Sequence, residues 1–173
     1  MNFHDPNEKE HNAMTKKLHE LSMKGSGEHA HGLDTTKTHK ELVKLYNKIH
    51  EKEKTAEQTQ MAVAALILLN KNDEARLLLD KWQNIGKEDR QWNTQYAWSY
   101  YMEKDYRNAI PYFSKVEDLL CTDTIMVNYL LECNEKVGNK EEITRLKNRI
   151  KELYSSGSGD RGKYKKENYY KNK

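Results

Sequence analysis

The histidines of this chain are clustered, and such a cluster could bind a metal ion. All seven histidines lie within the first fifty residues. A metal ion needs at least two ligands held on one face, and only His29 and His31, with Glu28 beside them, are close enough in sequence to suggest such a pair. Because the pair lies in a Gly-flanked stretch, we interpret these side chains as solvated loop residues, with metal binding as the alternative. We predict no metal and no cofactor.

The C-terminal segment, residues 155–173, combines lysines with tyrosines. It holds six Lys or Arg against two Asp or Glu, so the net charge of +3 on the chain lies mainly here. Lysines neutralise phosphates and tyrosines stack on unpaired bases, the combination used in sequence-tolerant single-strand binding. The segment has no aliphatic residue, so we expect it to be disordered, and a solubilising terminus is the simpler interpretation. The candidate nucleic-acid residues are Lys163, Tyr164, Lys165, Lys166, Tyr169 and Tyr170.

Motifs of the common catalytic classes do not occur in the sequence. There is no Gly-rich phosphate loop, no G-x-S-x-G turn and no nucleophile paired with a base in a familiar context. Neither Cys121 nor Cys133 is flanked by features that activate a thiol, and two cysteines make no disulfide framework. An N-terminal apolar run and an 18-residue apolar span are also missing. We therefore predict a non-enzymatic, cytoplasmic protein without membrane contact.

The rest of the chain has the composition of a helical protein. Two prolines and eight glycines interrupt it little, and 36% hydrophobic with 33% charged residues predicts a small core under much solvated surface. Apolar residues recur at three- and four-residue steps between short polar turns, which predicts an all-α fold with six helices in three antiparallel pairs over residues 56–154. Asn72 or Asp73 can cap one helix, which should stop at Gly86. Pro111 should kink its helix without ending it, because the apolar spacing continues past it.

The N-terminal third contains two further helical patterns. Leu18 and Leu21 belong to a weak apolar stripe, which we expect the Gly25–Gly27 stretch to interrupt, and the segment before residue 35 should be loosely attached. A stronger stripe that includes Leu42 and Tyr46 is expected to form a helix that caps the front of the repeat stack. The predicted segments are a helical or flexible region with a Gly-Ser-rich loop at 1–35, a helical domain at 36–154, and the disordered tail at 155–173.

A short pattern recurs along the helical region at a spacing of 34 residues. Ala75 and Ala109 occupy the same place in two similar stretches, and Ile143 marks a weaker third copy. All three positions are expected to be buried where two helices cross. A helix-turn-helix unit of this length cannot bury its apolar face alone, so consecutive units have to stack.

The middle copy carries residues at the offsets of a known repeat family. Tyr96-Ala97, Tyr100, Ala109 and Phe113 match the tetratricopeptide pattern, with Cys121 where that pattern has Pro. Over residues 56–154 the chain therefore resembles a divergent tetratricopeptide repeat protein. The resemblance implies a short superhelix of three stacked units with a concave groove.

The resemblance also implies a binding surface, because the first helix of each repeat lines the groove in that family. Trp98 and Tyr101 should face a partner there, since Tyr96 and Tyr100 take the buried phase; packing on a neighbouring helix is the alternative. Tyr129 falls at a groove offset of the third copy. The predicted partner-binding residues are Gln60, Gln95, Trp98, Tyr101, Asn128 and Glu132. The expected function is that of an adaptor for a protein or peptide, and the alternative is nucleic-acid contact through the tail.

Overall fold

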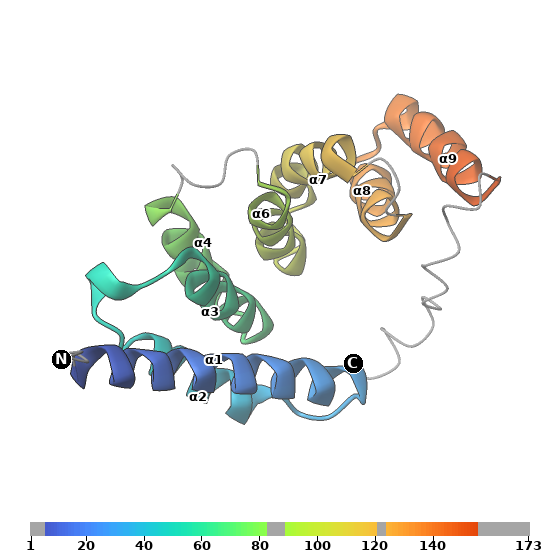
Figure 1. The fold of residues 1–173 in the computed structure, drawn as a ribbon. Helices are drawn as coiled ribbons and strands as arrows, with labels where there is room; N and C mark the ends of the chain where they lie inside the picture. Colours follow the sequence, from blue (N-terminus) through green and yellow to red (C-terminus); the bar gives the residue numbers. More distant parts are fainter. Residues whose placement is uncertain (1–5, 83–88, 121–123, 156–173) are drawn as a thin grey trace. The chain divides into compact units, whose positions relative to one another are not determined.

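The structure is a computed structural model that describes residues 6–82, 89–120 and 124–155, and these residues are all-α (Figure 1). Contacts divide the chain into two units, residues 1–85 and 86–173. The all-α prediction is confirmed. The predicted single domain at 36–154 differs from this division, because its first part belongs with the N-terminal segment in unit 1 and the remainder forms most of unit 2.

Unit 1 contains four α-helices and one turn of 3-10 helix within the described residues. In chain order these are α1 (Pro6–Ala30), α2 (Thr36–Tyr46), η1 (Glu51–Glu53), α3 (Ala56–Leu68) and α4 (Asn72–Lys81). Each helix packs on the next, and α1 also packs on α3 (Figure 1). The predicted extension of α4 toward Gly86 falls at residues 83–88, outside the described residues.

Unit 2 is a run of four helices, each packed on the next along the chain. They are α6 (Arg90–Met102), α7 (Tyr106–Leu120), α8 (Thr124–Val137) and α9 (Lys140–Ser155). With α3 and α4 they supply the six helices predicted between residues 56 and 154. Helix α7 continues through Pro111, which is exposed in its second turn, so the prediction that this proline does not end the helix is confirmed.

The helix pairs repeat at a spacing of 34 residues in the structure as well as in the sequence. The first helices begin at residues 56, 90 and 124, and the second helices begin at 72, 106 and 140. Thr55 and Asp89 cap the first two pairs in the same way, each accepting a hydrogen bond from the backbone N–H three residues on. Three equivalent helix-turn-helix elements therefore occur along the chain.

The turn inside each pair has the same backbone geometry. Asn70, Lys104 and Gly138, each 34 residues from the next, adopt positive φ angles of 58°, 62° and 79°. The following N–H reaches back five residues to a carbonyl of the first helix, at distances of 2.9, 3.0 and 3.0 Å. This arrangement satisfies a carbonyl that the helix end would otherwise leave without a partner. It also reverses the chain within two or three residues.

The positions at which the paired helices cross are buried in two of the three pairs. Ala75 and Ala109 are completely buried, as predicted. Ile143, predicted to be buried at the equivalent place, is only half-buried, and Leu146 fills the core instead.

An ion pair between Arg145 and Glu117 also joins α9 to α7. The guanidinium of Arg145 donates hydrogen bonds to both carboxylate oxygens of Glu117, at 3.0 and 2.6 Å, and further hydrogen bonds to Glu142. These two carboxylates hold the pKa of Arg145 above its usual range. The positive charge of Arg145 is thereby neutralised within unit 2.

The prediction that Gly25–Gly27 interrupts the first helix is wrong. Helix α1 continues through both glycines to Ala30. Gly25 is buried and faces His39 of α2, where an added Cβ would lie 2.6 Å from Nε2. A glycine inside a helix permits such close approach at a small cost in helix propensity. Gly25 therefore serves packing between α1 and α2 and does not break α1.

The expectation that the N-terminal segment is loosely attached is also wrong. Leu18 and Leu21 of α1 are buried in a cluster with Leu42 and Tyr46 of α2. A hydrogen bond of 2.7 Å from Gln58 Nε2 to Thr15 Oγ1 joins α3 to α1. Helix α2 packs on α3, as expected for a capping helix, and α1 adds a second layer to that end of unit 1.

The two glycines of α1 provide a matched test of this packing. Gly25→Ala should lower the free energy of unfolding by about 1–3 kcal/mol, because the new methyl group clashes with the buried ring of His39. Gly27→Ala should instead raise it by about 0.5–1 kcal/mol, since nothing lies within 4 Å of the added Cβ and alanine favours the helix. Urea unfolding of both variants measures these changes. Equal stabilisation by the two substitutions would contradict the contact.

The same contact makes unit 1 sensitive to pH. Burial lowers the pKa of His39 from its ordinary value of 6.5, an effect that Glu28 opposes and His29 reinforces. The unfolded chain therefore binds a proton more readily than the folded one, so stability is complete above pH 6.5 and falls as the pH drops toward the lowered pKa. His39→Gln should reduce the loss of thermal stability between pH 7.5 and 5. Exposed His31→Gln is the control, and an equal reduction in both variants would contradict the assignment.

Candidate functional site: an aromatic face on α6 and α8

Four aromatic side chains from three helices of unit 2 form one cluster. Trp98 of α6 meets Tyr129 of α8 edge to face, with ring centroids 4.6 Å apart. Tyr101 lies 5.4 Å from Trp98 and 5.2 Å from Tyr129, also edge to face. Phe113 of α7 stacks on Tyr129 at 6.1 Å. We call Trp98, Tyr101, Phe113 and Tyr129 the aromatic cluster.

The local structure of each helix explains this convergence. Asp89 caps the start of α6 by accepting a hydrogen bond from the Trp92 N–H at 2.9 Å. Trp98 and Tyr101 lie three residues apart and therefore on one side of α6. The turn at Lys104 then returns the chain so that Phe113 of α7 faces them.

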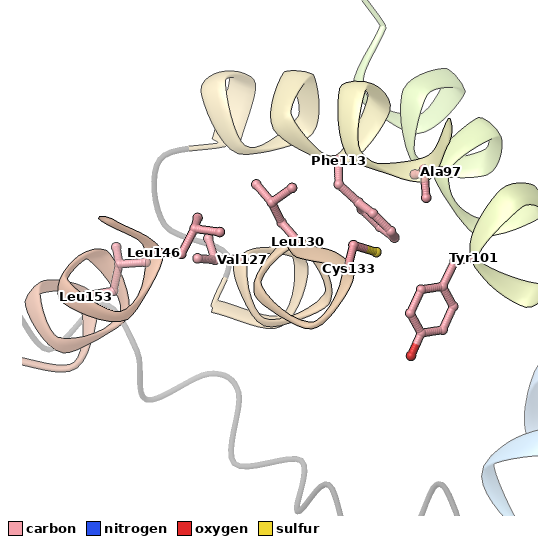
Figure 2. Close-up of a cluster of buried hydrophobic side chains, with 9 residues drawn as sticks. Ala97, Tyr101, Phe113, Val127, Leu130, Cys133, Leu146 and Leu153 are labelled. Atoms are coloured by element: carbon pink, nitrogen blue, oxygen red, sulfur yellow. The ribbon is translucent and has the colours of Figure 1, made fainter. Parts of the chain in front are cut away.

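Part of the cluster belongs to the hydrophobic core of unit 2. Phe113 is completely buried and Tyr101 is only 9% exposed, and both pack with Cys133 and Leu130 of α8. Figure 2 shows Phe113 projecting from α7 toward Cys133, with the ring of Tyr101 extending from α6 beside it. For Tyr101 the burial agrees with the alternative interpretation, packing on a neighbouring helix. The side chains of α8 cover the part of α6 that helical spacing alone leaves open.

The other two aromatic residues remain partly accessible. Trp98 and Tyr129 are half-buried and pack against the outside of the same core cluster. Of the predicted Trp98–Tyr101 pair, Trp98 is therefore half-buried and Tyr101 is a core residue, although the two rings remain in contact. Trp98 also contacts Tyr129 of α8.

The tyrosines predicted to take the buried phase of α6 form a separate row. Tyr96 is buried, as expected, whereas Tyr100 is half-buried. Both stack on Tyr112 of α7, at centroid distances of 4.8 and 5.8 Å. Stacked rings of this kind stabilise the α6–α7 contact beyond the area that they bury.

The remaining predicted site residues have different surroundings. Asn128 and Glu132 are half-buried and lie on the same side of α8 as Tyr129, whereas Gln95 on α6 is buried. The amide of Asn128 donates a 2.6 Å hydrogen bond to the Thr124 carbonyl, so its orientation is fixed. Gln60 is half-buried on α3 in unit 1, and the tail residues from Lys163 to Tyr170 lie outside the described residues.

The reactive and metal-ligating groups of the described residues are few. Burial raises the pKa of the Cys133 thiol to about 12, so the thiolate needed for nucleophilic attack is scarce at neutral pH. Within the described residues no three His, Cys, Asp or Glu side chains come together as a metal site. The described helices also include none with the length and apolar character needed to cross a bilayer.

Comparison with known proteins assigns no relative, since no protein-family model matches the chain and no curated protein matches it.

The division of the cluster into a core ring and a half-exposed ring can be tested by two single substitutions. Tyr101→Ala should lower the free energy of unfolding of unit 2 by about 3–5 kcal/mol, because it removes a large buried side chain. Trp98→Ala should cost clearly less, since part of that ring is already in water. Urea unfolding followed by circular dichroism measures both. The order would be reversed if Trp98 were the core residue.

Proposed function

We propose that this protein is a non-enzymatic adaptor, and that unit 2 binds a segment of a partner protein over the face formed by α6 and α8. The observation that carries the proposal is the partly buried Trp98–Tyr129 pair, which rests on buried Tyr101 and Phe113. Large aromatic rings are the usual anchors of protein interfaces. Neighbouring rings already hold these two side chains in place, so they would lose little conformational entropy when a partner binds.

Polar groups beside the aromatic pair suit the backbone of a bound segment. Glu132 lies three residues after Tyr129 and four after Asn128 on α8, so its side chain is next to both of theirs. Their side-chain oxygens can accept hydrogen bonds from backbone N–H groups or from a basic side chain of the partner.

Two further observations support the proposal. The 34-residue spacing of helix starts and of left-handed turns agrees with the tetratricopeptide resemblance, whose members bind peptides along the first helix of each repeat. Cys133 is an unbridged, buried thiol, which agrees with a reducing compartment such as the cytoplasm.

The experiment compares variants of the two half-exposed rings with an aromatic control. Partners captured by the intact chain are identified by quantitative mass spectrometry, and a peptide from the best candidate is titrated by calorimetry. Trp98→Ala and Tyr129→Ala should each weaken binding by about 2 kcal/mol, roughly thirtyfold. Tyr154→Ala, which removes an exposed ring on α9, should leave the affinity unchanged.

The design separates loss of binding from loss of folding. Circular dichroism of each variant at the temperature of the titration shows whether unit 2 is folded. A peptide that binds folded Trp98→Ala and Tyr129→Ala as tightly as the original chain would contradict the proposed site.

A further inference from the structure

Helix α9 presents a basic face that the proposed adaptor function does not use. The face comprises side chains spaced four, three, four and three residues apart, so that they follow one side of the helix. Its members are Lys140, Thr144, Lys147, Lys151 and Tyr154. Acidic residues of α9 occur only at other positions around the helix. We call this set the α9 basic face.

All five members of the α9 basic face are exposed. The side chain of Lys147 is 54% exposed and Tyr154 is 53% exposed, which is unusual for a ring of that size. Lys140, Thr144 and Lys151 are exposed as well. The apolar residues that attach α9 to α8, among them Leu146 and Leu153, lie on a different side of the helix.

The charges on this face are largely uncompensated within the described residues. Arg145, on another side of α9, is neutralised by Glu117 and Glu142. In contrast, no described carboxylate forms an ion pair with Lys140 or Lys151. Lys147 pairs with Glu135 of α8 at 3.1 Å, where both side chains are open to water and the bond is easily exchanged.

The spacing of these groups fits an extended polyanion. At 1.5 Å per residue, Lys140 and Lys147 lie about 10 Å apart along the axis, and Lys147 and Lys151 about 6 Å. Tyr154 follows one turn later, so a row of cations ends in an exposed ring. Cations that track a backbone, next to an aromatic platform for a base, form the usual surface for single-stranded nucleic acid.

We propose that the α9 basic face binds single-stranded nucleic acid. Charge complementarity selects a polyanion as the ligand, and the exposed ring of Tyr154 favours bases over a lipid surface. This binding is independent of the aromatic cluster on α6 and α8.

The charge contribution is tested in the intact chain with a fluorescent 20-nucleotide oligouridylate. Lys140→Gln, Lys147→Gln and Lys151→Gln together should weaken binding at least about tenfold at 50 mM salt, and should lower the slope of log K against log salt by about 2. The matched control is Lys37→Gln, Lys40→Gln and Lys44→Gln, which removes three exposed lysines from one side of α2. It should retain at least half of the original affinity.

The aromatic contribution has its own pair of variants. Tyr154→Ala should weaken binding by roughly fivefold or more, and Tyr154→Phe should restore it, because stacking requires the ring and not the hydroxyl group. Thermal unfolding is recorded for each variant to show that unit 2 is intact. Trp98→Ala should leave oligonucleotide binding unchanged, which distinguishes this surface from the proposed adaptor site.

Several outcomes would overturn the proposal. These are equal losses from the α9 and α2 triple variants, loss only when Lys163, Lys165 and Lys166 are replaced by Gln, and no detectable binding by the intact chain at 50 mM salt. Equally tight binding to phosphatidylserine vesicles, unaffected by Tyr154→Ala, would assign the face to a lipid surface instead.

Discussion

The turn that closes each helix pair is the constraint on which the rest of the structure depends. A residue with positive φ, at Asn70, Lys104 or Gly138, lets the next N–H return five residues to a carbonyl of the first helix. Lys104 adopts this conformation although it has a Cβ, which costs about 1–2 kcal/mol. The hydrogen bonds that end the helix and the packing of the pair offset that cost. With the turn fixed, the second helix must return along the first.

The proposed adaptor site follows directly from this geometry in unit 2. Reversal at Lys104 brings Phe113 under Trp98 and Tyr101, and the following helix adds Tyr129. The four rings thus have two roles. Tyr101 and Phe113 stabilise the core, and Trp98 and Tyr129 lie partly buried at its surface. Such a face can bind a partner without rearranging, because its anchors rest on a packed base. The α9 basic face differs in kind, since it uses charges that the fold leaves in water.

Sequence patterns predicted the parts of the fold that depend on local spacing. Long apolar stripes located the helices, and the 34-residue recurrence of Ala75 and Ala109 located the two helix pairs in which small residues are buried. The errors lie where contacts between distant helices decide. Gly25 looked like a helix breaker because glycine disfavours helices. That penalty is only about 1 kcal/mol, and the sequence does not show the contact that outweighs it, because the ring of His39 is 14 residues away. Propensity is a weak effect that packing readily overrides.

By itself, the sequence determined that the chain is helical, which stretches form helices between residues 56 and 154, and that α6 is rich in aromatic residues. These properties depend on neighbours within one or two turns, which periodicity records directly. Only the tertiary structure decided that Tyr101 is core, that Trp98 meets Tyr129, and that α1 belongs with α2 and α3. Each of these outcomes depends on which side chains of another helix cover a given face. Spacing along a single helix does not show which side chains of other helices bury its faces, because those side chains come from distant parts of the chain.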